Sequence, residues 1–297
     1  MSYCFKFLPG LTAIPKDGEA SEDACYIHER SIGVADGVSG WNAFGLNAAE
    51  FSSSLINNAY SIIVKMLKDH EYYEYYSHPI NPFEIIEKAY SMVKSIGSST
   101  ISICALNNSI FQCANLGDSG FILFRYTDKG YILKEFSRDQ QHEFNTPCQL
   151  SNLPKSDDFI RFEKELKENE LSDLKKAMKE KKLCHDSPSL ADRYNITVCN
   201  KDILIVASDG VLDNLFLSEI KKIIDSTIKE SSWTWCKQGA QTISENIGCM
   251  AYKKSKMDIV KTPFGVKYEK HLRSSWPSGK EDDITVAVGL ITKVCSD

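Results

Sequence analysis

Carboxylates recur at the ends of apolar, strand-like runs in this sequence, each beside a glycine or another small residue. Asp36 follows such a run and enters a glycine-rich turn in GVADGVSGW, and Asp209 occupies the same kind of position in IVASDGVLD. Asp118 lies between two runs in ANLGDSG. The same pattern includes Glu22 and Asp23 in GEASEDACYI, and Asp282 and Asp283 in GKEDDITV. Taken singly, each is most simply a turn residue, because Asp and Gly are common in turns.

Taken together, these carboxylates predict a metal site. Strand ends of one sandwich can meet at a common edge, where several carboxylates repel one another and are costly to bury unpaired. Lys280 is the only basic residue adjoining the motifs, so a metal is the better counter-charge. Oxygen ligands without His or Cys favour Mg²⁺ or Mn²⁺, with the Gly37 carbonyl as a further oxygen. Two such ions about 3.5–4 Å apart would activate a shared water and polarise a phosphoryl group, which predicts a phosphate-ester hydrolase.

The elements that would position these residues are antiparallel strands and helices in separate blocks. We expect two strands over 24–35, four runs between 100 and 137 that form one antiparallel meander, a pair over 194–208 joined by a tight turn, and a last strand over 283–291. Helices are expected over 46–67, about 217–229 and 236–252, and behind Asn81 as N-cap with Pro82 at the first position. The fold class is therefore α+β: a β-sandwich of two antiparallel sheets flanked by helices, in four layers α-β-β-α, with the metal site at one edge.

One segment, residues 161–182, is dense in Glu and Lys at helical spacing. Its sparse apolar stripe consists of Phe162, Leu166, Leu171, Leu174 and Met178. We interpret it as a solvated helix that is held by i,i+4 ion pairs and lies loosely on the domain. The alternative is a docking insertion for a partner protein. We expect one domain over 1–297, with 158–190 as a charged helical insertion within it.

Composition excludes several classes of protein. The chain has 297 residues, of which 42% are hydrophobic and 25% charged, and a net charge of −5 argues against nucleic-acid binding through a basic field. The 10 cysteines form no CxxC pair, which favours reduced thiols. The apolar runs are shorter than the roughly 20 residues of a membrane span. The N-terminus lacks the features of a signal or transit peptide, so we expect a cytoplasmic monomer, or a mitochondrial protein if a presequence was removed.

Three other stretches have structural interpretations. We expect Trp233 and Trp235 to be partly buried anchors, and EYYEYYSH (71–78) to be an amphipathic helix end with exposed tyrosine tips, with a docking patch as the alternative. His142 is expected to be a hydrogen-bonded structural residue, because it lies away from every acidic motif in the sequence.

In their order along the chain, the acidic motifs resemble those of the metal-dependent protein phosphatases (PPM, type 2C). SEDA resembles the first acidic motif of that family, ADGVSGW its DGxGG motif and GSST its small-residue strand entry. ANLGDSG, ASDGVLDN and KEDDITV resemble its GDS, DGxxD and DN blocks. The resemblance covers nearly the whole chain. DGVSGW, FSRDQQHEFNTPCQLS and DDITV are most similar to the PTC-seven-homologue branch, whose known animal and yeast members are mitochondrial; relative to that branch, the acidic helix at 161–182 is an insertion.

The resemblance implies a Mg²⁺- or Mn²⁺-dependent phosphatase that acts on phosphoserine and phosphothreonine in proteins. Asp36 would bridge two metal ions, with the Gly37 carbonyl on one of them, and Asp209 and Asp282 would complete the ligand set. The nucleophile would be the bridging water. The resemblance assigns supporting positions to Glu22, which would hold a metal-bound water, and to Asp23 and Asp283, and it makes Asp118 and Asp213 candidates for a third metal.

Three departures from the family pattern bear on mechanism. Many members carry a histidine, proposed as general acid, where this chain has Val38. Many also have a phosphate-gripping arginine before the first acidic motif, where this chain offers only Lys16 at a different spacing. Ser39 replaces a glycine of DGxGG, which narrows the allowed backbone angles.

The main alternative function is a catalytically silent adaptor that has this fold and binds partner proteins through its charged insertion. Silent relatives usually lose a core aspartate, and this chain keeps Asp36, Asp209 and Asp282. A metal-dependent nuclease is disfavoured, because the chain is acidic and has no basic strip.

Overall fold

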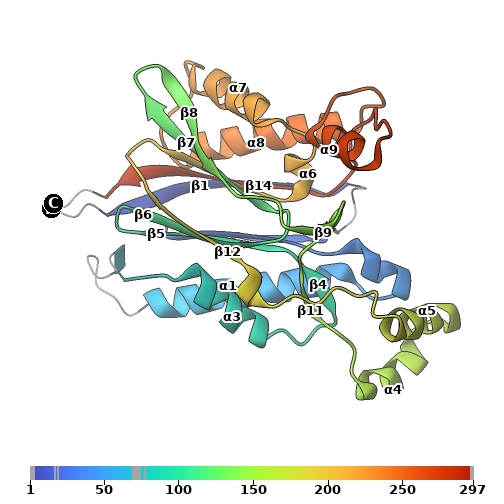
Figure 1. Ribbon diagram of the computed structural model, residues 1–297. Coiled ribbons are helices and arrows are strands. Elements are labelled where there is room, and N and C mark those ends of the chain that lie inside the picture. The colour runs from blue at the N-terminus through green and yellow to red at the C-terminus, as the bar shows by residue number, and fades with distance from the viewer. Residues whose placement is uncertain (1–3, 17, 19, 69–74, 77, 295–297) are drawn as a thin grey trace.

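Two five-stranded antiparallel sheets lie face to face in the computed structural model, which describes residues 4–16, 18, 20–68, 75–76 and 78–294 (Figure 1). The first sheet has the order β1 (Phe5–Ile14), β14 (Ile284–Lys293), β13 (Ile203–Ala207), β7 (Gly120–Thr127) and β8 (Gly130–Phe136). The second has the order β12 (Asp192–Thr197), β6 (Ile110–Leu116), β5 (Ile101–Asn107), β3 (Ser31–Asp36) and β2 (Asp23–Ile27). Most of the tyrosine-rich stretch at 71–78 lies outside the described residues.

Helices cover the outer face of each sheet, so the predicted four-layer sandwich is confirmed (Figure 1). The second sheet is covered by α1 (Ala48–Leu67) and α3 (Pro82–Ser91), and the first by α7 (Leu217–Ile228) and α8 (Lys237–Ser255). The shorter elements are η1 (Ser39–Phe44), β4 (Gly97–Ser99), β9 (Gln141–Glu143), β10 (Thr146–Pro147), β11 (Leu150–Asn152), η2 (Pro188–Leu190), α6 (Asp209–Leu212) and α9 (Pro263–Leu272).

Local sequence explains where two of the helices begin. The Asn81 side chain accepts a hydrogen bond of 3.2 Å from the Phe83 amide, and Pro82 occupies the first turn of α3, as predicted. Asn47 caps α1 in the same way. Each cap satisfies a backbone donor that has no partner within the helix.

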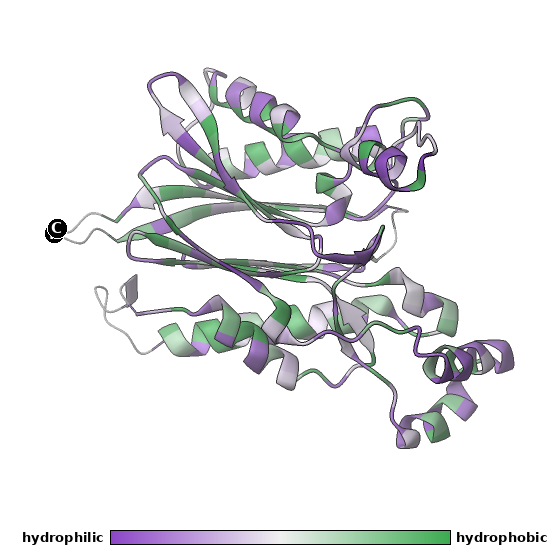
Figure 2. Ribbon diagram, viewed as in Figure 1, coloured by the Kyte–Doolittle hydropathy of each residue, from purple (hydrophilic) through white to green (hydrophobic). Residues whose placement is uncertain are grey.

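The core has one layer between the sheets and one layer under each helix pair. In β5 the side chains alternate: Ile101 and Ile103 pack toward α1 and α3, whereas Cys104 and Leu106 face the other sheet. Because both faces of this strand are covered, its sequence is a continuous apolar run rather than an alternating one. Figure 2 shows apolar residues along the strands and on the inward helix faces.

The predicted single meander over 100–137 is wrong. β5 pairs with β6 and β7 pairs with β8, but the turn at 117–119 carries the chain from one sheet to the other. The turn at 199–202 makes the same crossing between β12 and β13. Apolar periodicity identifies a strand without naming its partner, so two hairpins in different sheets have the same sequence pattern as a meander.

The sequence analysis also missed β1 and α9. β1 pairs with β14 along its whole length, and Pro9 and Gly10 interrupt its apolar pattern. Both residue types are depleted in strands, so strand propensity does not identify β1. β1 is an edge strand of its sheet, where a proline is tolerated.

The charged segment forms two helices instead of one over 161–182, and it does not lie loosely. α4 (Ser156–Glu165) and α5 (Glu168–Lys179) are separated by extended backbone at Leu166. Phe162 and Leu174 are fully buried in a cluster with Trp41 and Ile96. The apolar stripe therefore docks the pair against η1, while hydrophilic residues dominate the rest of α4 and α5 (Figure 2).

Substitutions in α4 test this docking. Phe162→Ala removes a fully buried aromatic ring, so we expect the local free energy of unfolding to fall by about 3 kcal/mol and amide exchange in α4 and α5 to accelerate about 100-fold. Ile160→Ala, at a side chain that is 64% exposed on the same helix, should leave exchange nearly unchanged. Equal exchange rates in the two variants, measured by mass spectrometry, would contradict the docked arrangement.

Candidate metal centre

Three aspartates from distant parts of the chain meet at one end of the sandwich. Carboxylate oxygens of Asp36, Asp118 and Asp209 all lie within 4.8 Å of one another. Asp36 ends β3, Asp118 lies in the turn between β6 and β7, and Asp209 begins α6 after β13. The chain crossing at 117–119 brings Asp118 into the same cluster as Asp36 and Asp209, and its role at a third metal stays a prediction.

Buried carboxylate oxygens without hydrogen-bond partners fit a metal site. Oδ1 of Asp118 and Oδ1 of Asp209 are buried and accept no hydrogen bond, and Oδ1 of Asp23 is in the same condition. A buried anionic oxygen of this kind is costly unless a cation or a proton compensates it. A cluster built only from oxygen donors suits the hard cations Mg²⁺ and Mn²⁺.

Close backbone approach explains the glycines that follow two of these aspartates. A Cβ atom at Gly37 would lie 2.7 Å from the Glu22 carbonyl oxygen and 2.8 Å from that of Ala48. A Cβ atom at Gly210 would lie 2.0 Å from the Asp283 carbonyl oxygen. Both glycines let neighbouring segments close tightly around the acidic residues. The role of the Gly37 carbonyl as a metal ligand stays a prediction.

Two lysines reach into the acidic cluster. Lys280 donates to Asp209, and its Nζ lies 2.9 Å from Oδ2 of Asp213 and 3.3 Å from Oδ2 of Asp282. Lys267 of α9 lies 3.1 Å from Oδ1 of Asp213. Sequence reasoning noticed Lys280 beside Asp282 but missed Lys267, because only the fold of α9 brings it to the site.

Burial and mutual repulsion set the protonation of the cluster. Burial, and then the charge of Asp209, raises the pKa of Asp36 well above its ordinary value. Burial and the charges of Asp209 and Asp213 raise the pKa of Asp118 to about 8. Burial alone would also raise the pKa of Asp209, but the Lys280 ammonium outweighs it and holds that pKa below its ordinary value. Burial and the Asp209 charge raise the pKa of Asp282 to about 6.

The charge balance therefore leaves room for added cations. Among the described residues of the cluster, more carboxylates converge than Lys267 and Lys280 can neutralise, and the pKa values of Asp36 and Asp118 are raised. A divalent cation would compensate these carboxylates without a proton. The residues present thus fit the predicted metal.

The remaining predicted residues, Glu22, Asp23 and Asp283, are joined by hydrogen bonds to the segments next to the cluster. Asp283 accepts hydrogen bonds of 2.9 Å from the Lys16 amide and 2.7 Å from the Glu22 amide, so it ties the segment before β2 to the start of β14. Ser208 donates to Asp23 over 2.7 Å. Two of these residues, Glu22 and Asp283, line a cavity of about 180 Å³ together with Pro15, Lys16, Ala20, Ser39 and Asn42.

Sequence reasoning missed three polar side chains that position the acidic ones. Asn42 of η1 donates to the Glu22 carboxylate, and Ser208 donates to Asp23. Gln141 of β9 donates to Asp118 over 2.9 Å. None of the three has a sequence signal of its own, because each is an ordinary polar residue near a turn.

Val38 takes part in packing. Its side chain packs against the cluster that includes Trp41 and Phe162, and its amide donates to the Ser98 carbonyl over 3.0 Å. The residue that replaces the family's histidine is therefore a hydrophobic contact between the turn after β3 and the docked helices. Its aliphatic side chain has no proton that could be transferred to a leaving group.

The expected hydrogen bond of His142 is confirmed. The ring is hydrogen bonded, as expected, with Nε2 2.8 Å from Oδ2 of Asp186. However, the residue does not lie away from the acidic motifs in space, because the preceding Gln141 contacts Asp118. Trp233 and Trp235 pack partly buried against the layer under α7 and α8, as expected.

Relatives identified by sequence are protein phosphatases. No protein-family model matches the chain. The PTC7 homolog of Homo sapiens is 30% identical over 287 residues, which cover 92% of this chain and 80% of that protein. The PTC7 homolog of Danio rerio is 31% identical over 287 residues, with 92% and 82% covered. Probable protein phosphatase 2C 55 of Arabidopsis thaliana is 29% identical over 291 residues, or 96% of this chain, and the chain spans about half (52%) of that relative.

Solved structures share the fold. The photosystem II phosphatase PBCP is similar with a TM-score of 0.69 and 24% identity over 95% of this chain and 97% of that one. The catalytic domain of the serine/threonine phosphatase PstP, solved with 2 manganese ions, is similar with a TM-score of 0.55 and 13% identity over 97% and 99% of the two chains. At these identities the likeness shows the fold alone.

The sequence relatives and the shared helix-flanked double sheet together define the class of this protein as the PPM protein phosphatases. The chain belongs to this family, also called type 2C, and lies near its PTC7 branch. As for membranes, none of the described helices has both the length and the apolar composition needed to cross a bilayer.

Removing the ammonium of Lys280 tests the charge balance of the cluster. Lys280→Met leaves Asp209, Asp213 and Asp282 without their shared cation, so the free energy of unfolding in excess EDTA should fall by roughly 3 kcal/mol. Lys270→Met, at an exposed lysine of α9, serves as the control and should change it by less than about 0.5 kcal/mol. Urea unfolding measures both, and equal stabilities would contradict a structural role for this ion pair.

Proposed function

We propose that this chain is a Mg²⁺- or Mn²⁺-dependent protein phosphatase that hydrolyses phosphoserine and phosphothreonine in protein substrates. The observation that carries the proposal is the cluster of half-buried Asp36 with buried Asp118 and Asp209, which has unpartnered oxygens on the latter two and more negative charge than its lysines neutralise. Membership of the PPM family supports the same chemistry, and one structural neighbour was solved with manganese.

The proposed ligand set combines the cluster of Asp36, Asp118 and Asp209 with the family pattern. Asp36, Asp209 and Asp282 would hold two ions together with the Gly37 carbonyl, and Asp118 with Asp213 would hold a third. When bound, the metal pair activates a water as nucleophile and polarises the phosphoryl group. Asp36, Asp209 and Asp282 would therefore act in catalysis as metal ligands, with a water rather than a side chain as the nucleophile.

The residues around the ligands have positioning roles in this proposal. Asp283 fixes the backbone of Glu22, and Asn42 donates to the Glu22 carboxylate in the cavity that Lys16 and Asp283 also line. Gln141 holds one oxygen of Asp118 and so leaves Oδ1 of that residue to a ligand. Because Val38 gives no proton, the leaving oxygen of serine or threonine takes its proton from water.

The charged segment 158–190 is proposed to be an insertion within one phosphatase domain. Its helices α4 and α5 dock beside η1, the helix that carries Asn42, so the insertion forms a border near the metal centre. A partner protein that docks on its exposed charged surface would lie near the bound substrate. The adaptor hypothesis needs this surface but not the metal ligands.

A pair of asparagine variants tests the proposed activity. Asp36→Asn removes the bridging charge, so Mn²⁺-dependent hydrolysis of an aryl phosphate and of a phosphothreonine peptide should fall at least 100-fold. Asp128→Asn, at an exposed aspartate of the turn between β7 and β8, should retain full turnover. Both variants are assayed with Mn²⁺ or Mg²⁺ after removal of metal with EDTA.

The adaptor hypothesis makes the opposite prediction. It would be favoured if the folded wild-type chain showed no metal-dependent turnover of either substrate while Mn²⁺ still raised its melting temperature. Equal turnover in wild type and Asp36→Asn would show that any hydrolysis arises outside this cluster.

A further inference from the structure

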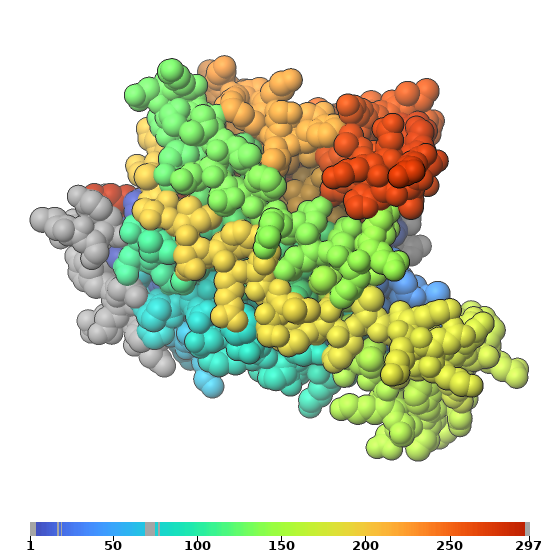
Figure 3. All heavy atoms as spheres, in the orientation of Figure 1, coloured from blue at the N-terminus to red at the C-terminus, as the bar shows by residue number. Residues whose placement is uncertain are grey.

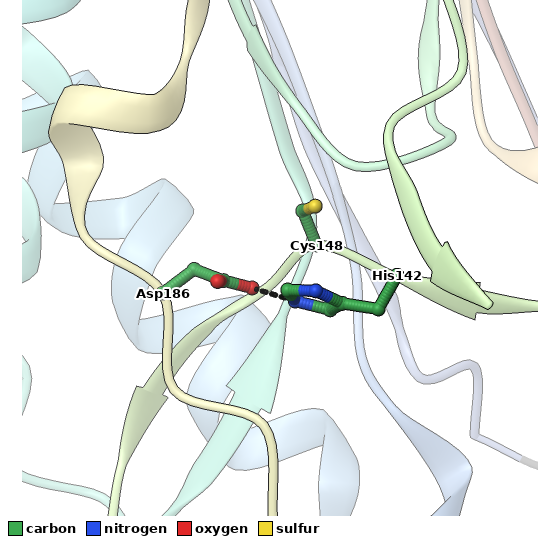
Figure 4. A group of neighbouring side chains, drawn as sticks. All are labelled: His142, Cys148 and Asp186. Atoms are coloured by element: carbon green, nitrogen blue, oxygen red, sulfur yellow. Dashed lines mark hydrogen bonds and ion pairs between the residues drawn. The ribbon is translucent and has the colours of Figure 1, made fainter.

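A second group of metal-ligating side chains lies on the surface near the acidic centre. His142, Cys148 and Asp186, here called the His142 cluster, each offer one ligand atom within 4.8 Å of the others. They come from β9, from the residue after β10, and from the segment after α5 (Figure 4). We propose that this cluster binds a Zn²⁺-like transition-metal ion at a site separate from the acidic centre.

The ligand types determine which metal the site would take. One imidazole nitrogen, one sulfur and one carboxylate oxygen form a donor set typical of zinc, in contrast to the oxygen-only set around Asp36. Around a tetrahedral zinc, with bonds of about 2.0–2.3 Å, ligand atoms are separated by roughly 3.3–3.6 Å. Distances of up to 4.8 Å in the His142 cluster therefore require small side-chain movements only.

Backbone pairing holds the cluster in place from both sides. The Asp186 amide donates to the Gln149 carbonyl over 3.0 Å, and the Gln149 amide donates back to Oδ2 of Asp186 over 2.8 Å. Ser151 then donates to the Cys184 carbonyl over 2.6 Å. The segment that carries Asp186 is thus fastened to the residues directly after Cys148, so two of the three ligands are positioned without a metal.

The third ligand is already oriented and is open to solvent. Nε2 of His142 lies 2.8 Å from Oδ2 of Asp186, so the ring faces the carboxylate (Figure 4). The His142 side chain is 43% exposed and that of Asp186 only 8%, which gives an entry path on one side and a buried anion on the other. Metal binding would replace this hydrogen bond, release the thiol proton of Cys148 to solvent and leave the fourth position to water.

The position of the cluster links it to the rest of the molecule. Residues 138–149, here called the arm, carry both His142 and Gln141, whose amide holds Asp118. At the tip of the arm Phe144 contacts Phe264 and Tyr268, with ring centroids 5.3 and 5.6 Å apart. Figure 3 shows this part of the chain on the surface between the α9 segment and the residues that follow α5. An ion in the cluster would fix the arm to the end of the insertion.

Cobalt spectroscopy on the full chain tests the site. Co²⁺ added to the reduced, metal-free protein should produce a thiolate-to-cobalt charge-transfer band and the strong visible bands of tetrahedral cobalt, and these should saturate at one ion per chain. Zn²⁺ should abolish the bands by displacement, whereas excess Mg²⁺ should not. Absence of a thiolate band in the wild-type chain overturns the proposal.

Variants assign the band to its ligands. Cys148→Ser and His142→Gln should abolish the thiolate band, and circular dichroism with thermal unfolding verifies that both are folded. Cys184→Ser is the matched control, because Cys184 is also half-buried and lies two residues before Asp186, but outside the cluster. Asp36→Asn alters only the acidic centre. Both of these variants should keep the band, and a band that survives Cys148→Ser or disappears in Cys184→Ser contradicts the assignment.

Discussion

Repulsion among buried carboxylates is the constraint on which the rest of this structure depends. Asp36, Asp118 and Asp209 converge at the ends of strands whose other residues are almost all buried and apolar. In such surroundings burying a negative charge costs free energy, and nearby hydrogen-bond donors or cations must stabilise it. Lys280 supplies part of it, but Oδ1 of Asp118 and Oδ1 of Asp209 are buried without a hydrogen-bond partner, and burial raises the pKa of Asp36 and of Asp118.

The two sheets make this convergence possible. Each sheet presents strand ends to the same edge, and the crossings at 117–119 and 199–202 place consecutive strands in different sheets. Because the layer between the sheets is tightly apolar, the polar turns can gather only at the edges. The glycines at 37 and 210 then allow the turns to approach more closely than any other residue would permit.

The segments outside the sandwich complete the surroundings of the site. The docked helices α4 and α5 bury Trp41 next to the turn that follows Asp36, and α9 brings Lys267 to Asp213. The arm contributes Gln141 to Asp118. Each of these contacts comes from a segment that has no acidic motif of its own, so the local sequence says little about it. Variation in these segments would change the borders of the metal centre and leave the aspartates in place.

The sequence by itself determined the fold class, the family and the acidic residues of the site, because these depend on local patterns: apolar runs, capping residues and carboxylates beside glycine at strand ends. It could not determine which strands pair, because periodicity carries no information about partners, and so it joined β6 to β7 in one sheet. Only the tertiary structure decided that Asp118 lies within 4.8 Å of Asp36 and Asp209, that Lys267 reaches the cluster beside Lys280, and that Phe162 is buried. These contacts join residues far apart in the chain, and the free energy that favours them comes from burial and charge compensation in the folded state.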